Sequence, residues 1–437
     1  MADPLLEGAE IAVSLATSAG AEGAFASMSR RRSVSLSVRD QELEKVQEST
    51  DTSLSLQIYV DGRYSAHGTN DLRPDALQSF VEEAVALTRA LEVDKYRELP
   101  DPARYAKAMP ELDLYDPAVE AQELDERLET AMALNARVAG KDKVISASSS
   151  VFAGYGESGA VSSNGFSGMY SGTSTGMYAN VTLRGEGDKR PEGGWGMNAR
   201  HSARLLSPEK IGDEAMFRAR RRLGSQKGPT AKTTMVVDRD AATSLIVRLL
   251  GPASGGAVQQ GRSMWADKLG QKVLDEKLSI VSNPLIPGAV ASRPFDDEGV
   301  ASFEMPIFEN GTLKNYFLSS YYARKLEAKP TTGSWGNIIV KPGQRDLETI
   351  VRDVGKGVYV TSWLGGNADS TTGDFSFGLR GHLIEGGKIG SPIGEMNVTG
   401  NLVTLFNGLH EIGNDPWEHS MFRTPSLVFK DVQFSGR

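Results

Sequence analysis

The chain has 437 residues, of which 39% are hydrophobic, 24% are charged and 47 are glycine. This length exceeds one ordinary core and predicts two domains, and abundant glycine with few aromatic residues favours turn-rich β structure over a helical bundle. The formal net charge of -8 offers no basic surface to a nucleic acid, and the lack of cysteine excludes disulfides and thiolate chemistry.

The sequence also shows no pattern typical of a membrane span or of a secretory signal. No apolar run approaches the roughly 20 residues of a membrane span, and the stretch from Ser244 to Leu250 is interrupted by Arg248. The first residues, MADPLLEGAE, lack the basic flank of a secretory signal. We therefore expect a cytoplasmic protein that binds neither membrane nor nucleic acid.

The first 70 residues alternate between helix and strand patterns. Apolar residues at helical spacing predict a helix over 4–19, ended by Gly20. The basic cluster Arg30 to Arg32 predicts a solvated turn before a half-buried strand at 34–38. A strand over 54–60 ends at Asp61-Gly62, a pair that favours the positive φ of a tight hairpin turn.

Two amphipathic helices follow, over about 75–91 and 119–138. Their inward faces are expected to hold Leu77, Phe80, Val81, Ala84 and Leu87 in the first helix and Leu124, Leu128, Ala131 and Met132 in the second. Helices packed on one side of an antiparallel sheet predict an α+β fold, with an N-terminal α/β domain.

The middle of the chain is rich in serine and glycine. Residues 146–194 alternate only weakly and predict short strands with mobile hairpins. A basic helix over 208–223 is followed by a turn-rich segment at 224–229, which we interpret as the domain boundary, giving domains 1–224 and 230–437.

The second half begins with a predicted strand at 233–237 and a helix that is capped by Asp238 and runs to Leu250. The rest is predicted to be mostly β, with turns at Asn310-Gly311 and Gly386-Gly387.

Four blocks of the second half carry a resemblance: PFDDEGVASFEM (294–305), ENGTLKNYFLSSYYARKL (309–326), DSTTGDFSFGLRGHLIEGGKIGSPIGEMNVTGNL (369–402) and PSLVFKDVQFSG (425–436). They resemble the TldD/PmbA family of two-subunit peptidases, once called modulators of DNA gyrase. The resemblance implies an α/β N-terminal domain and a C-terminal domain with a curved, barrel-like sheet. In that family the TldD subunit holds zinc through a helical HExxxH motif and a late cysteine, whereas the TldE (PmbA) subunit holds none.

This chain departs from TldD at each metal position. Counting back from Ser263-Met264-Trp265, the ligand positions of the matching helix fall near Ile246 and Gly251, and the position of the base falls near Val247. None of these side chains can bind a metal or transfer a proton. The spacing of Leu245, Ile246 and Leu249 instead predicts core. The chain thus resembles the TldE type, with no metal or catalytic residue of its own and with zinc expected in the partner subunit.

Two acidic segments are placed near the peptide channel by the resemblance alone. The first is Asp296, Asp297 and Glu298, and the second is Asp369, Ser370, Thr371, Thr372, Gly373 and Asp374. By composition the first trio would be a solvated turn. The resemblance implies proximity to substrate for both segments and no catalytic role.

Three other motifs lack the spacing or the following helix that a metal, nucleophile or dinucleotide site requires. His410, Glu411 and His419 lack the helical spacing of a zinc motif and predict a surface or subunit-contact loop. The GxSxG pattern from Gly172 to Gly176 and the GxGxxG pattern of Gly154, Gly156 and Gly159 have no following helix. An aspartic-protease pair is not present.

The functional expectation is a non-catalytic subunit of a zinc metallopeptidase complex that processes unstructured peptides, paired with a TldD-type subunit or with itself. Trp417, Met421 and Phe422 cluster in a turn-rich segment and predict a dimer contact, against the alternative that they pack under their own domain. Two other functions stay open: a stand-alone homodimeric peptide-binding scaffold, and an independent enzyme that does not use zinc. The sequence identifies neither the peptide nor the cleavage position.

Overall fold

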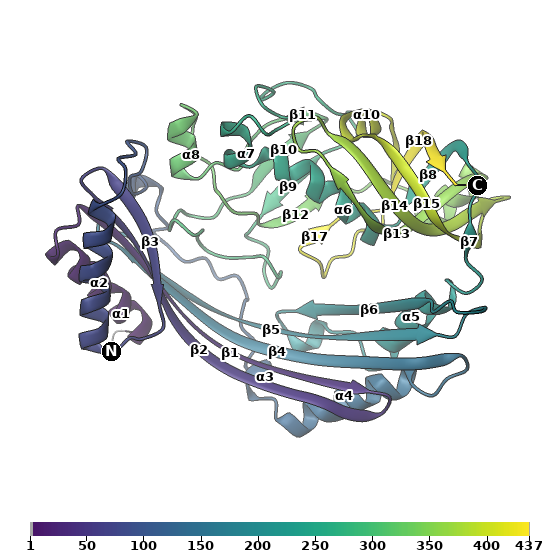
Figure 1. Ribbon diagram of the computed structural model, residues 1–437, viewed down its shortest axis with the longest axis horizontal. Coiled ribbons are helices and arrows are strands. Elements are labelled where there is room, and N and C mark those ends of the chain that lie inside the picture. Colours follow the sequence, from purple (N-terminus) through teal and green to yellow (C-terminus); the bar gives the residue numbers. More distant parts are fainter. Residues whose placement is uncertain (1–2, 437) are drawn as a thin grey trace.

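The computed structural model describes residues 3–436, and these form two halves that face each other (Figure 1). The N-terminal half is one long curved sheet with helices behind it, and the C-terminal half lies over the concave side of that sheet. Its elements are α1 (Pro4–Ser18), β1 (Gly23–Arg39), β2 (Glu42–Val60), β3 (Arg63–Thr69), α2 (Pro74–Arg89), α3 (Pro117–Ala121), α4 (Leu124–Val138), β4 (Val144–Ser162), β5 (Ser167–Leu183), β6 (Glu192–Ala199) and α5 (Pro208–Arg220), with short 3-10 turns at Pro102–Arg104 and Ser202–Arg204.

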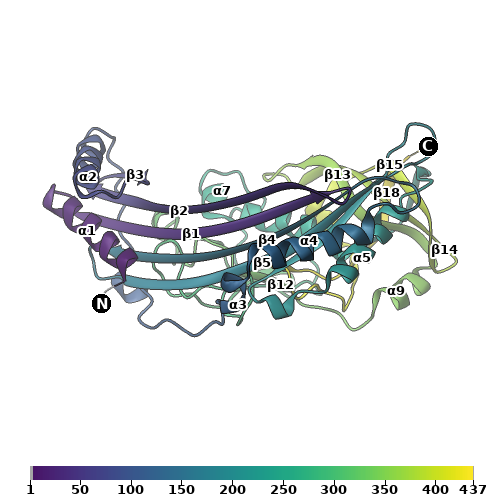
Figure 2. The same cartoon turned by 90° about the horizontal axis from the view of Figure 1, so that it is seen from below.

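The six strands of this sheet are antiparallel in the order β3-β2-β1-β4-β5-β6. Helices α1 and α2 pack on one end of the convex face and α4 and α5 on the other (Figure 2). The apolar residues predicted from alternation, such as Leu54, Leu56 and Ile58, point to these helices and are buried. The hairpin at Asp61-Gly62 has positive φ at both residues, as predicted.

Two sequence predictions for this sheet are wrong. Residues 144–183 form the two long strands β4 and β5 instead of short strands. The cluster Arg30 to Arg32 lies in the middle of β1 rather than in a turn, because Arg30 and Arg32 form ion pairs with Glu157 and Glu48 of the neighbouring strands. Both strands are held by pairing with residues distant in the sequence.

The predicted helix over 119–138 is two helices. Asp116 accepts a hydrogen bond from Ala118 N and begins α3, and a capping box between Glu123 and Glu126 begins α4. Leu87 and Leu124 were expected inside but are 60% and 45% exposed. The buried stripe of each helix is therefore narrower than its apolar pattern.

The C-terminal half contains two sheets and several short helices. Strand β18 pairs with both β8 and β15, which closes β8, β13, β14, β15 and β18 into a barrel. The predicted α+β class with a curved, barrel-like C-terminal sheet is confirmed. The elements are β7 (Gln226–Lys227), β8 (Ala231–Val237), α6 (Arg239–Leu250), α7 (Gly255–Gln259), β9 (Ile280–Asn283), β10 (Met305–Glu309), β11 (Thr312–Leu313), α8 (Ser320–Lys325), β12 (Asn337–Val340), α9 (Leu347–Val354), β13 (Lys356–Ala368), β14 (Asp374–Glu385), β15 (Lys388–Asn401), α10 (Leu402–Asn407), β16 (Leu409–Ile412), β17 (Phe422–Arg423) and β18 (Leu427–Ser435), with a 3-10 turn at Gly251–Ala253.

The two halves are joined at separated places. Near β3, Arg324 of α8 donates to the carbonyls of Tyr96, Glu98 and Leu99 at 2.7–3.2 Å. Near β6, Arg218 of α5 forms an ion pair with Asp240 of α6 at 2.7 Å. Among the described helices, none has the length and apolar character needed to cross a membrane.

Candidate functional site

Helix α6 is the helix that, by resemblance, matches the zinc-binding helix of the TldD subunit. Its N-cap is Asp238, as predicted, whose carboxylate accepts from Asp240 N. The predicted core residues Leu245, Ile246 and Leu249 are confirmed, since each is fully buried. Val247 is only partly buried and Gly251 begins the following 3-10 turn. At these positions the helix carries apolar side chains that pack in the core, and no side chain that could bind a metal.

The segment after α6 is fixed to the end of the helix. The Trp265 indole donates to Leu249 O at 2.7 Å, and the Ser263 hydroxyl donates to Pro252 O at 2.6 Å. Residues 3–436 hold no group of three or more His, Cys, Asp or Glu side chains that is arranged to bind a metal ion. The end of α6 and the segment after it therefore form a tightly packed, apolar part of the core.

The acidic trio lies in a loop between the halves. Asp296 is 5% exposed; its carboxylate accepts from Glu298 N at 3.0 Å, Val300 N at 3.1 Å and the Thr332 hydroxyl at 2.8 Å. Burial raises the pKa of Asp296 above its usual range. Its position indicates a structural role that holds the loop.

The other two acids of the trio have different surroundings. Glu298 accepts from the backbone and the hydroxyl of Ser320, at the start of α8, and burial raises the pKa of Glu298. Asp297 is exposed and accepts from the Ser334 hydroxyl at 2.7 Å. Of the trio, Asp297 is the one that faces open space.

The second acidic segment is a tight turn between β13 and β14. Asp369 accepts from the backbone of Thr371 and Thr372 at 2.7 and 3.1 Å, and these hydrogen bonds lower the pKa of Asp369. Ser370 O accepts from Met264 N, so the turn lies against the segment after α6. Gly373 has a φ of +82°, and Asp374 accepts from Asn401 at 2.9 Å. The two acidic segments therefore contact different parts of the C-terminal half.

The residues expected at a dimer contact are half-buried within the chain. Trp417 packs against Trp195 of β6, with ring centroids 5.6 Å apart, and Phe422 packs against Trp335 at 5.9 Å. Met421 O accepts from Ile338 N. Trp417 thus joins the two halves of one chain, a use that its sequence context did not indicate; a dimer contact at this segment stays a prediction. His410 and Glu411 lie in strand β16, so the predicted loop is wrong there.

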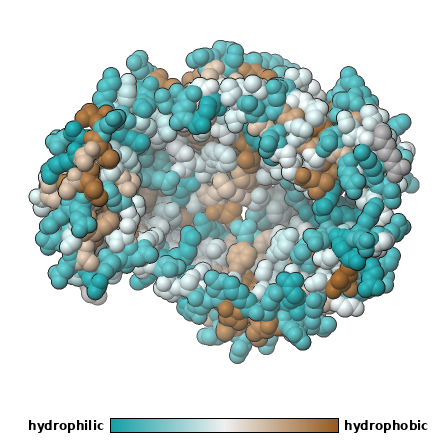
Figure 3. Space-filling view, viewed as in Figure 1, coloured by the Kyte–Doolittle hydropathy of each residue, from teal (hydrophilic) through white to brown (hydrophobic). Residues whose placement is uncertain are grey.

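A hollow on the concave face of the six-stranded sheet was missed by sequence reasoning. It consists of two adjoining cavities of about 350 and 430 Å³ that share Ser158 and Tyr170. Figure 3 shows the hollowed centre of the molecule between the halves. We call these two cavities the concave groove. Phe295 and Asp297 line the first cavity, and Arg31 and Arg200 line the second.

The floor of the groove is made of small side chains. Serines 27, 29, 33 and 35 alternate along the inner face of β1, and the hydroxyls of Ser29 and Ser33 contact those of Ser53 and Ser49 at 3.1 and 2.9 Å. The signal in the sequence is this two-residue repeat of serine, since alternate residues of a strand lie on the same face of its sheet. Such a surface exposes hydroxyl groups and backbone and suits an extended ligand.

Models of the three domains of the PmbA/TldA metallopeptidases match residues 24–88, 117–223 and 230–436. A PmbA metalloprotease homologue from Haemophilus influenzae is 30% identical over 99% of this chain and 96% of its own length. The chain belongs to the PmbA/TldD family. Two solved structures of similar fold agree with this: a putative modulator of DNA gyrase from Bacteroides thetaiotaomicron, 37% identical with full coverage of both chains and a TM-score of 0.96, and TldE from Thermococcus kodakarensis.

Within the PmbA/TldD family, the likeness to that TldE concerns the fold. It is 18% identical, covers 98% of this chain and 100% of the other, and has a TM-score of 0.87. The fold and the family are thus established.

Proposed function

We propose that this chain is the metal-free, TldE-type subunit of a cytoplasmic zinc metallopeptidase complex, and that it pairs with a HExxxH-bearing TldD-type subunit. In this role the concave groove helps to enclose an unstructured peptide beside the zinc of the partner. The observation that carries the proposal is the apolar packing of α6: Ile246, at one expected ligand position, is fully buried, and the other expected position is Gly251. A zinc peptidase site needs side chains that bind the metal, such as His, Cys or a carboxylate, and an activated water.

The groove supports the peptide-holding part of the proposal. Its floor of serine and glycine leaves backbone and hydroxyl groups available, and these recognise an extended main chain more than particular side chains. Asp297, the exposed acid of the first cavity, and the turn from Asp369 to Asp374 belong to the proposed channel. The segment with Trp417, Met421 and Phe422 is proposed as part of the contact with the second subunit.

Reconstitution tests this function. The purified chain, a TldD-type subunit and a 1:1 mixture are assayed with an unfolded casein substrate, with and without a chelator. We expect cleavage by the mixture, loss of cleavage with chelator, and no cleavage by this chain alone. A matched mixture in which the glutamate of the partner's HExxxH motif is glutamine should assemble and be inactive.

Chelator-insensitive cleavage by this chain alone would exclude the proposal. Stable self-association without any binding to the partner, measured by analytical ultracentrifugation, would favour a homodimeric scaffold instead.

A further inference from the structure

The second cavity of the concave groove has an unusual charge. Its lining includes the guanidinium groups of Arg31 and Arg200 and contains no carboxylate, although the chain carries a net charge of -8. The cavity has a volume of about 430 Å³. A concave, acid-free surface with two guanidinium groups attracts an anion.

Among residues 3–436, Arg31 has no carboxylate partner for its charge. Its neighbours Arg30 and Arg32 point to the convex face and bind Glu157 and Glu48. Arg31 is exposed on the concave face. Asp51 lies opposite it in the register of β2, yet among the described residues no carboxylate is within 4 Å of the Arg31 guanidinium. Its donors are therefore available to a ligand.

Arg200 follows β6 and is anchored without being neutralised. It donates to Thr173 O at 3.2 Å and to Val290 O at 2.9 Å, and both acceptors are uncharged carbonyls. Burial lowers the pKa of Arg200, and the nearby positive charge of Arg31 lowers it further. A bound anion would compensate the buried charge.

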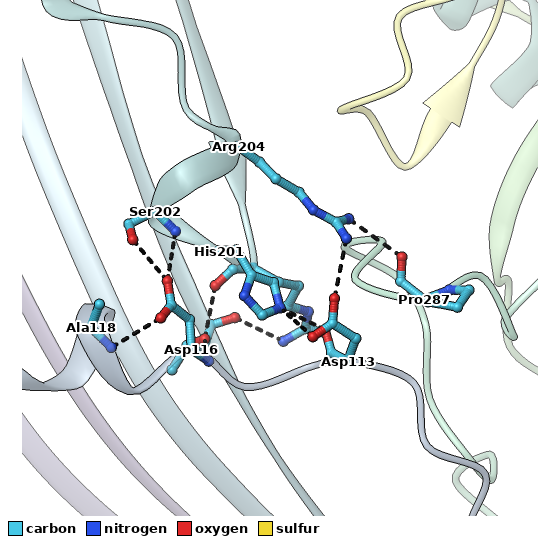
Figure 4. Close-up of polar contacts among 9 residues, drawn as sticks. Asp113, Asp116, Ala118, His201, Ser202, Arg204 and Pro287 are labelled. Atoms are coloured by element: carbon cyan, nitrogen blue, oxygen red, sulfur yellow. Dashed lines mark hydrogen bonds and ion pairs between the residues drawn. The ribbon is translucent and has the colours of Figure 1, made fainter.

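The position of Arg200 is fixed by the residues that follow it. His201 contacts Asp113 at 3.0 Å, and the Asp116 carboxylate accepts from the backbone and hydroxyl of Ser202 at 2.8 Å (Figure 4). Arg204 bridges Asp113 and the carbonyl of Pro287 in the C-terminal half, at 3.2 and 3.3 Å. This network preorganises the wall of the cavity that holds Arg200.

The sheet surface between the two arginines is formed by glycines, so no side chain at these positions fills the space between the guanidinium groups. In the register of the sheet Arg31 lies opposite Gly156, and Gly156 lies opposite Gly172. A Cβ on Gly172 would be 2.8 Å from the Arg200 guanidinium, whereas a Cβ on Gly156 would meet nothing closer than 3.9 Å. Gly154 and Ser174 form the next pair of the floor. Gly154, Gly156, Gly172 and Ser174 thus place small residues on one sheet surface, whereas Gly159 faces α1 on the other side of the sheet.

We propose that this cavity binds the carboxylate of an extended peptide, between Arg31 and Arg200, and so anchors the peptide in the groove. Guanidinium groups form paired, charge-assisted hydrogen bonds with a carboxylate, and the hydroxyls of Ser174 and Ser158 supply neutral donors. The shared residues Ser158 and Tyr170 let the anchored chain continue into the first cavity. The proposal rests on the peptide-holding role proposed above.

Calorimetric titration of the full-length chain tests the anchor with four N-acetylated hexapeptides of Gly, Ser and Ala. One has a free C-terminal carboxylate, one is amidated, and two amidated peptides carry an internal Glu or Gln. We expect at least one carboxylate peptide to bind about tenfold more tightly than its neutral match. Free-acid preference assigns the anchor to the peptide C-terminus, and Glu preference assigns it to an acidic side chain.

Substitutions inside and outside the second cavity test whether the carboxylate preference arises there. Arg31→Gln removes one guanidinium, and Gly156→Ala raises the floor without a clash; each should abolish the preference for the carboxylate. Arg73→Gln and Gly68→Ala, at an exposed site and at an open position in β3, should retain it. Circular dichroism checks that each variant is folded.

Equal binding of charged and neutral peptides, or a preference that survives Arg31→Gln, would overturn the anchor and leave the peptide-holding role standing. No binding of any peptide would overturn both.

Discussion

Helix α6 and the inner face of β1 are both surfaces of regular elements that face the interior of the molecule, yet their side chains have opposite surroundings. In α6, Leu245, Ile246 and Leu249 are fully buried, and the next segment closes over the helix through Trp265. Along β1, serines and Arg31 line open space. The difference teaches that the side chains of α6 stabilise the packing of the C-terminal half, whereas those on the concave face of β1 are free to contact a ligand.

The largest effect expected from this contrast is at Trp265, which is 1% exposed and packs on Phe308 at 5.4 Å. Trp265→Ala should lower the free energy of unfolding by about 3 to 5 kcal/mol, because it leaves a large cavity under α6. Urea denaturation followed by far-ultraviolet circular dichroism measures it. A loss below 1 kcal/mol would mean that the region near α6 is not a packed support.

A smaller effect is expected at Trp417, which lies between the halves. Trp417→Ala removes the contact with Trp195 and the cation–π contact with Arg239 at 5.0 Å, and should cost about 1 to 2 kcal/mol. The same variant tests the predicted dimer contact by analytical ultracentrifugation. Weakened association would add an intermolecular role to the internal one, and unchanged association would remove it.

The acidic loop gives a pH-dependent prediction. Because burial raises the pKa of Glu298 above 4.5 in the folded chain, the native state retains a proton that the unfolded state loses. Stability from this group is complete below pH 4.5 and declines as the pH rises through the raised value. Glu298→Gln should make the decline in melting temperature above pH 4.5 shallower, which thermal denaturation at a series of pH values measures; an unchanged slope would contradict the prediction.

The smallest effect is expected on the concave floor. Ser174→Ala should change the free energy of unfolding by less than about 0.5 kcal/mol, since its side chain faces the cavity. The matched change Ser426→Ala removes a buried hydroxyl that donates to Asp415 at 2.7 Å and should cost about 1 to 3 kcal/mol. Equal losses at the two serines would remove the distinction between floor and core.

The sequence predicted those parts of the fold that depend on local signals. The helix over 4–19, the hairpin at Asp61-Gly62 and the cap at Asp238 follow from spacing and from single residues. The division into domains 1–224 and 230–437 stays a prediction.

The concave groove could not be predicted in the same way. Strands β4 and β5 carry serine and glycine, which have low strand propensity, and are held by pairing along their whole length with distant residues. Likewise, Arg31 and Arg200 are 169 positions apart in number, and only the register of the sheet brings them to one cavity. The acidic segments were located by resemblance, and their hydrogen bonds show that most of their oxygens already serve the local structure.

The joints between the halves have a mechanical consequence. Arg324 near β3, Arg204 in the middle and Arg218 near β6 each contact the opposite half of the chain. These three contacts together set the distance between the halves and so the width of the concave groove. Contacts at both ends and in the middle oppose a hinge-like separation of the halves. In the proposed peptide-holding role, a groove of restrained width would admit an extended chain and exclude a folded protein by its diameter rather than by its sequence.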